Sequence, residues 1–223
     1  MAARSPARFL HQRLREMLLA AALLIAEGAL LALAGFWWWP LSLLALLPVL
    51  FLARAAALGG PLDPVSLRNG IRGEERVARV LAELEPAGFQ VLHDLDVGRG
   101  NADHVVVGPT GVFVIETKDW GGRFYRSRGR LMFNNRAADE VVGQVTTAAL
   151  EVRRRLDRAG IDVWVQAIVA STRASVSGGA LRLGHLTAVE ADGLPAFIVG
   201  RRPSLDDAAI RDAVTAILAD ERR

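Results

Sequence analysis

The sequence predicts an α/β domain, in which a mixed β-sheet is flanked by helices, preceded by a pair of apolar helices. Between residues 68 and 223, short β-branched runs alternate with longer segments whose apolar residues recur at helical spacing. The chain is 52% hydrophobic with a mean hydropathy of +0.26, and the excess lies in the first 58 residues. A length of 223 residues allows one ordinary domain plus an appendage.

Charge and cysteine content narrow the possible functions. The chain has no cysteine, so disulfides and thiolate metal sites are excluded, and any metal must use oxygen or imidazole ligands. Such ligands favour hard cations such as Mg²⁺ or Mn²⁺.

The net charge of +3 resides in residues 1–58, while acidic and basic residues balance in 59–223. A nucleic-acid site in the domain must therefore be a local patch.

The first 58 residues predict a membrane anchor. Residues 1–16 are polar and basic, and two apolar runs follow, Met17–Phe36 and Leu41–Leu58. Each run is about long enough to cross a bilayer, and three tryptophans and a proline between them suit an interfacial turn. We expect a transmembrane hairpin over 17–58, with the lipid bilayer as a partner and a homo-oligomer formed through it. Arginines on both outer ends place both termini in the cytoplasm, at the inner membrane.

A helix is expected after a linker at 59–67, which contains Gly59-Gly60-Pro61. Apolar residues of the segment 69–84 recur at helical spacing. Glu74 lies on or next to the buried face, where a carboxylate needs a partner. The alternative is an exposed first-turn glutamate, favoured by the helix dipole.

The stretch Asn101–Lys118 predicts a β-hairpin around the turn residues 108–111. If Val107 faces Val112, Asp103 lies opposite Glu116, and alternation brings these two carboxylates and Lys118 to one face. Opposed carboxylates need a cation or a proton between them. The arrangement is half of a divalent-metal site with an ammonium beside it.

Lys118 is the only lysine among 27 basic residues. A lone lysine in a chain that otherwise uses arginine suggests a role for a compact point charge with a shiftable pKa. The alternative is a lysine at a strand end that forms a surface ion pair with Asp119.

The remaining elements follow in order. We expect strands at 89–97, 163–170, 186–189 and 196–199, and a helix at 137–159. A last helix is expected to start in the segment Ser204-Leu-Asp-Asp207, which offers a good N-cap, and to run to about residue 220. A second hairpin spans 121–133 around Ser127-Arg128-Gly129. Its arginines stand among aromatic residues, which suits a nucleic-acid backbone, although an ordinary charged hairpin is an equal alternative. These arginines are Arg123, Arg126, Arg128 and Arg130.

Four segments together resemble the nuclease-related domain (NERD) family of the PD-(D/E)xK nuclease superfamily. They are Gly70-Ile-Arg-Gly73-Glu74, Gly100-Asn-Ala-Asp103-His104, Gly108 to Lys118, and Trp120-Gly121-Gly122. The resemblance covers about residues 68–180. It implies a restriction-endonuclease-like fold for residues 68–223.

The resemblance also implies roles for individual residues. Asp103 and Glu116 would hold Mg²⁺ (or Mn²⁺), with the Thr117 carbonyl as a third ligand. Lys118 would position and help deprotonate the attacking water, or stabilise charge in the transition state. Glu74 would complete the acidic cluster, and Gln144 would contact it from its helix. By alternation His104 points to the opposite face and is expected to be structural.

The function expected from these residues is a membrane-anchored, metal-dependent nuclease that hydrolyses phosphodiester bonds, with DNA as the expected nucleic acid. The alternative is a non-catalytic, membrane-tethered module that binds nucleic acid or protein.

Overall fold

The computed structural model describes residues 7–35, 50, 64–98 and 100–219. Contacts divide the chain into two units, one of which is Arg8–Ile71, while the other is built on Arg72–Arg223. The domain boundary expected at residue 68 stays a prediction, and residues 64–67 of the expected linker belong to the helix α4 (Pro64–Ala82).

In the first unit, α1 (Arg8–Gly35) is a single helix of 28 residues. Five of its large apolar side chains are more than half exposed. These are Leu18, Leu19, Leu23, Ile25 and Leu30. Across the part of the chain that the structure describes, no helix has the length and apolarity needed to cross a membrane. The transmembrane hairpin expected over 17–58 is therefore not supported, and all of its second run except Leu50 lies outside the described residues.

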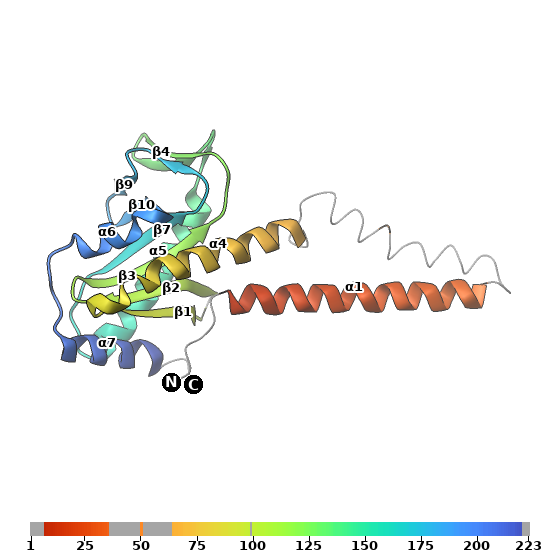
Figure 1. Ribbon diagram of the computed structural model, residues 1–223, viewed down its shortest axis with the longest axis horizontal. Coiled ribbons are helices and arrows are strands. Elements are labelled where there is room, and N and C mark those ends of the chain that lie inside the picture. Colours follow the sequence, from red (N-terminus) through yellow and green to blue (C-terminus); the bar gives the residue numbers. More distant parts are fainter. Residues whose placement is uncertain (1–6, 36–49, 51–63, 99, 220–223) are drawn as a thin grey trace. The chain divides into compact units, whose positions relative to one another are not determined.

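The second unit is centred on a mixed, six-stranded sheet of order β1-β2-β3-β7-β10-β9 (Figure 1). The strands β3, β7 and β10 run parallel, and the other neighbours are antiparallel. The strands are β1 (Gln90–Asp96), β2 (Asn101–Gly108), β3 (Gly111–Lys118), β7 (Val165–Ser171), β9 (Ala180–Leu183) and β10 (Leu186–Glu190). The mixed sheet expected from the sequence is confirmed.

Helices cover both faces of this sheet. The helix α4 (Pro64–Ala82), which crosses the boundary between the units, and α6 (Leu194–Val199) contribute to one apolar core, with Phe113 and Ile115 of β3. The helices α5 (Asp139–Arg158) and α7 (Asp207–Ala219) contribute to the other, with Val112 and Val114. Side chains of β3 thus alternate between the two cores, as expected for a strand buried on both faces. A short 3-10 helix, η1 (Glu85–Ala87), follows α4, and η2 (Ala191–Gly193) precedes α6.

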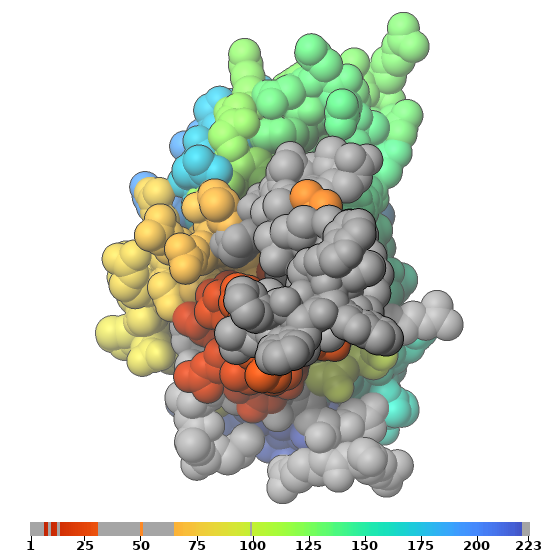
Figure 2. Space-filling view, turned by 90° about the vertical axis from the view of Figure 1, so that its right-hand side faces the viewer, coloured from red at the N-terminus to blue at the C-terminus, as the bar shows by residue number. Residues whose placement is uncertain are grey.

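A smaller sheet has the order β6-β5-β4-β8. Its members are β4 (Arg123–Ser127), β5 (Arg130–Phe133), β6 (Arg136–Ala137) and β8 (Ser175–Val176). Arg128 and Gly129 form the two-residue loop between β4 and β5, and both have positive φ, which is the geometry of tight hairpin loops. The expected second hairpin is confirmed, and it stands at the top of Figures 1 and 2, far from α7.

One expectation about the C-terminal part is wrong. Residues 196–199 belong to α6, not to a strand, because Pro195 suits a helix start and a four-residue apolar run has no readable period. The last helix begins at Asp207, within the expected segment 204–207, and Asp206 caps it by accepting a hydrogen bond of 2.8 Å from the Ala209 amide. Ser204 donates its amide to the Pro109 carbonyl at 2.7 Å, so it is tied to the β2–β3 turn.

Candidate active site

The β2–β3 hairpin has the register expected from the sequence, since Val107 pairs with Val112. The last ladder pair is His104 with Ile115, and the next position outward in that register sets Asp103 against Glu116. Glu116 and Lys118 share a face of β3, and the Lys118 Nζ lies 2.6 Å from Glu116 Oε1. Both side chains are largely buried, so this ion pair is shielded from solvent.

Asp103 lies one position beyond the last ladder pair of β2 and β3. Its Oδ2 accepts a hydrogen bond of 2.6 Å from the Thr117 amide, in place of a backbone ladder bond. In a strand, the amide and carbonyl of one residue point to the same neighbouring strand. The Thr117 carbonyl is therefore also directed toward β2, on the side where Asp103 lies.

The helix α4 brings Glu74 to this end of the sheet by a close approach. A Cβ added at Gly73 would lie 2.9 Å from the Asp119 Cβ and 3.5 Å from the Thr117 Cγ2. Only a glycine permits this distance between the helix and the end of β3. The next residue, Glu74, is 8% exposed, so the expectation that it lies on the buried face is confirmed and the exposed alternative is wrong.

The acidic groups interact strongly. Burial, followed by the charges of Asp94 and Glu116, raises the pKa of Glu74 from 4.5 to about 8. Burial, with the charges of Glu116 and Glu74, also raises the pKa of Asp103 well above its ordinary value. Carboxyl groups that raise one another's pKa in this way favour a bound proton or a bound cation.

Lys118 keeps its proton in this cluster. Burial lowers the pKa of Lys118, but the charge and hydrogen bond of Glu116 and the charges of Asp103 and Glu74 outweigh it, so the pKa is raised. An ammonium with a raised pKa is a poor proton acceptor at neutral pH. The direction of this pKa shift supports charge stabilisation by Lys118 over deprotonation of water, and both roles stay predictions.

Asp94 is a fourth acidic residue near this cluster, and the sequence pattern does not indicate it. His93 pairs with His104 and Leu95 with Ala102, so Asp94 occupies the register position opposite Asp103. It is 6% exposed, has φ of +52°, and its Oδ1 accepts a 2.6 Å hydrogen bond from the Asn101 amide group. Counting outward along β1 and β2 could have found it, but the positive φ interrupts the alternation on which such counting depends.

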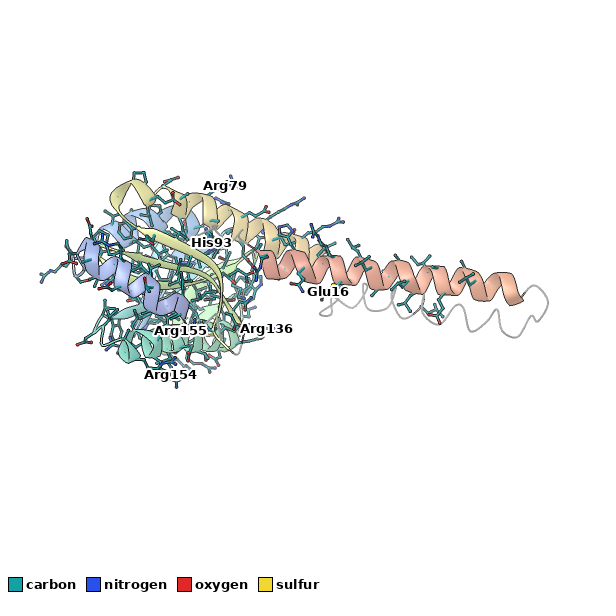
Figure 3. The ribbon with its side chains drawn as sticks, turned by 90° about the horizontal axis from the view of Figure 1, so that it is seen from below. Glu16, Arg79, His93, Arg136, Arg154 and Arg155 are labelled. Atoms are coloured by element: carbon teal, nitrogen blue, oxygen red, sulfur yellow. The ribbon has the colours of Figure 1, made fainter. Side chains whose placement is uncertain are left out.

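His104 faces away from the cluster, as expected. It is fully buried, and its Nδ1 lies 2.8 Å from the Nδ1 of His93, which Figure 3 labels. Burial lowers the pKa of His104 to about 3, so the ring is neutral. A neutral pair that shares one proton between the two strands is a structural contact.

Aromatic rings lie directly beside the lysine. The Lys118 Nζ is 5.8 Å from the centroid of the Trp120 ring, which is 37% exposed. The Trp120 ring stacks on buried Phe124 with centroids 6.2 Å apart and contacts Phe133 at 4.9 Å.

The four arginines of the second hairpin are all exposed, but two of them have protein partners. Arg130 forms an ion pair with Asp139, and the Arg123 Nε donates to Ser177 Oγ at 3.3 Å. Arg126 lies on β4 and Arg128 in the hairpin loop. Binding of nucleic acid by these arginines stays a prediction.

Gln144 is exposed on α5, between the buried Val141 and Val145. Its contact with the site also stays a prediction.

The residues fit a hard divalent cation in their chemistry. Asp103 and Glu116 offer carboxylate oxygens, and the Thr117 carbonyl is directed to the same side. Among the described residues, no three His, Asp or Glu side chains are arranged as a metal-binding group. Mg²⁺ binds through one or two carboxylates and keeps several waters, so a set of two carboxylates and a carbonyl suits it.

Part of this chain is similar to known protein sequences. A stretch of 64 residues is 41% identical to an uncharacterized protein of Bacillus anthracis, and it covers 26% of this chain and 30% of that protein. No solved structure matches the chain. Residues 69–172, which include most of α4, the β2–β3 hairpin and α5, match the family model of the nuclease-related domain, NERD.

Proposed function

We propose that this chain is a metal-dependent nuclease that hydrolyses phosphodiester bonds in nucleic acid, with DNA as the expected substrate. The observation that carries the proposal is the buried group at the end of β3. There the Glu116–Lys118 ion pair lies in the field of Asp103 and Glu74. The match of residues 69–172 to the nuclease-related domain supports the same function.

Asp103 and Glu116 would hold Mg²⁺ or Mn²⁺, with the Thr117 carbonyl as a third protein ligand. A cation bound there would polarise a phosphoryl oxygen and lower the pKa of a water molecule. The Thr117 amide holds the Asp103 carboxylate in one orientation, which reduces the entropy lost on ligation.

Lys118 would act as a fixed positive charge. Its ion pair with Glu116 orients the ammonium, and the raised pKa keeps it protonated while negative charge builds on the phosphoryl oxygens. Glu74, whose carboxyl is largely protonated at neutral pH, would position the cluster from α4.

The test is cleavage of labelled DNA and RNA, single- and double-stranded, by the full chain with Mg²⁺ or Mn²⁺. Loss of the charge in Lys118→Ala should lower kcat at least about 100-fold, as does loss of a comparable transition-state contact. Asp103→Asn should lower activity and metal affinity together. Glu140→Gln, an exposed residue in the first turn of α5, is the control and should cut as the wild type does.

If the wild type cuts none of these substrates, or if Lys118→Ala and Asp103→Asn cut as well as the wild type, the nuclease proposal fails. Binding of nucleic acid without cutting would then support the non-catalytic alternative.

Location at the inner membrane is a separate proposal, and it comes from the two apolar runs of residues 17–58. The exposed apolar side chains of α1 support an apolar partner for that helix. Membrane fractions washed at alkaline pH should retain the full chain, and its recovery in the supernatant would contradict this location.

A further inference from the structure

The exposed aromatic ring next to the lysine has no role in the cluster described above. Trp120 follows β3 directly, and its ring lies 5.8 Å from the Lys118 Nζ. A ligand on this ring is therefore adjacent to the group that would meet the phosphate. The glycine that follows, Gly121, is exposed, and a Cβ added there would contact nothing within 4 Å, so the space next to Gly121 is open.

The ring is held in place from behind. Phe124 is fully buried and stacks on Trp120 at an interplanar angle of 21°, while Phe133 contacts it with centroids 4.9 Å apart. A ring fixed by two others loses little conformational entropy when a flat ligand stacks on it. Both phenylalanines belong to the β4–β5 hairpin, which also carries the exposed Arg126 and Arg128. Aromatic rings combined with basic side chains are the means by which proteins bind unpaired nucleotides, and here Lys118 lies beside the ring while the arginines lie on the hairpin that supports it.

We propose that Trp120 is a stacking platform for an unpaired base next to the cleaved phosphodiester, so that the site prefers single-stranded nucleic acid or single-stranded segments. Bases within a duplex are stacked on both faces, and only an unpaired or flipped base can offer a face to a protein ring. Stacking is tolerant of base identity, so the preference concerns strandedness and not sequence. This inference rests on the proposed nuclease function for its substrate, but it can be measured as binding alone.

The experiment measures the affinity of the full chain for a labelled oligodeoxynucleotide and for its duplex, in EDTA so that neither is cut. Trp120→Leu should weaken binding of the single strand roughly 5- to 100-fold, which is the loss expected for one base–aromatic stack. Duplex binding should change much less. Trp120→Phe keeps an aromatic ring and should retain most of the affinity. Trp164→Leu, which removes a tryptophan that is 64% exposed and directly precedes β7, should change neither affinity.

A second measurement covers the case in which Trp120→Leu disturbs the hairpin. Single-stranded DNA should quench the intrinsic fluorescence of the wild type, and this quenching should be reduced in Trp120→Phe but not in Trp164→Phe. Three results would overturn the proposal. They are equal quenching in both variants, an equal loss of affinity for single strand and duplex in Trp120→Leu, and a wild type that binds neither form.

The outcomes separate this inference from the nuclease function. If Lys118→Ala and the wild type both leave DNA uncut, but the single-strand affinity depends on Trp120, the platform stands and the nuclease proposal fails. If the wild type cuts single strands and duplexes equally well and Trp120→Leu alters neither, the nuclease proposal stands and the platform fails.

Discussion

A buried carboxyl group loses most of its hydration, and Glu74 loses it in the field of Asp94 and Glu116. The consequence is a pKa of about 8, so that the folded protein holds a proton that a solvated glutamate has released. The pKa of Asp103 is also raised, while the hydrogen bond from the Thr117 amide and the charge of Lys118 lower it. The negative charge of these carboxylates can be compensated by a proton, by the lysine or by a bound cation, and the chemistry of the site depends on which of these is present.

Glu74 should therefore make stability fall as pH rises. Between its ordinary pKa of 4.5 and about 8, the folded state binds more protons than the unfolded state, so this contribution is complete at low pH and is lost as pH approaches 8. Urea unfolding in EDTA at pH values between these limits should show a slope of up to about 1.4 kcal/mol per pH unit. Glu74→Gln should flatten the slope, and an unchanged slope in that variant would show that Glu74 is ionised in the folded protein.

At the scale of elements, the position of α4 relative to β3 depends on one missing side chain. A Cβ at Gly73 would lie 2.9 Å from the Asp119 Cβ, so a larger residue would push the helix from the strand end. Because Glu74 is the next residue, the same displacement would move its carboxyl away from Glu116 and Lys118.

Gly73→Ala should destabilise the domain by about 1 to 3 kcal/mol through overpacking, even though alanine favours helices. The control is Gly143→Ala in α5, where a Cβ meets nothing within 4 Å. That substitution should stabilise the domain by up to about 1 kcal/mol. Chemical denaturation of both variants checks the contrast, and an equal gain in both would show that the helix and strand tolerate the extra atom.

Arg155 connects three elements on the α5 side of the sheet (Figure 3). Its side chain is buried, since the residue is only 7% exposed. The Arg155 Nη1 donates a hydrogen bond to the Ile217 carbonyl of α7 at 3.0 Å, and the Nη2 donates one to the Asp96 carbonyl of β1 at 2.7 Å. A buried guanidinium that satisfies two carbonyls holds α7 and the end of β1 against α5.

Arg155→Met keeps the apolar stem and removes both hydrogen bonds to carbonyls, so that the buried Ile217 carbonyl and the Asp96 carbonyl lose this donor. We expect a loss of about 2 to 5 kcal/mol in the free energy of unfolding. Its neighbour Arg154 has a side chain that is 71% exposed, and Arg154→Met should change stability by less than about 0.5 kcal/mol. Thermal and urea unfolding of the pair provide the test, and similar small effects would show that α7 is held by apolar packing alone.

At the scale of the whole molecule, ligand binding and stability are linked. A cation that binds only the folded site stabilises it by about 2.7 kcal/mol at a concentration 100 times its Kd. Adding Mn²⁺ or Mg²⁺ should raise the Tm of the full chain, and EDTA should reverse the change. Asp103→Asn should show a much smaller increase, whereas an equal increase in the variant would place the bound cation elsewhere.

Much of the fold could be predicted because its signals are local. Turn residues 108–111 between β-branched runs set the β2–β3 register, which was confirmed pair by pair. The helices α4 and α5 follow from apolar spacing. The run 196–199 could not be assigned, because it is too short to distinguish a strand from the helix that Pro195 begins.

The sequence by itself determined the oxygen-rich donor set, the single lysine and the hairpin that brings Glu116 and Lys118 to one face, since each depends on residue type and on spacing over a few positions. Only the tertiary structure decided that Glu74 enters the same electrostatic field, that Asp94 opposes Asp103, and that Trp120 rests on Phe124 and Phe133 beside the lysine. These relations arise from packing between elements distant in the chain, and pKa shifts depend on the burial and charges that such packing creates.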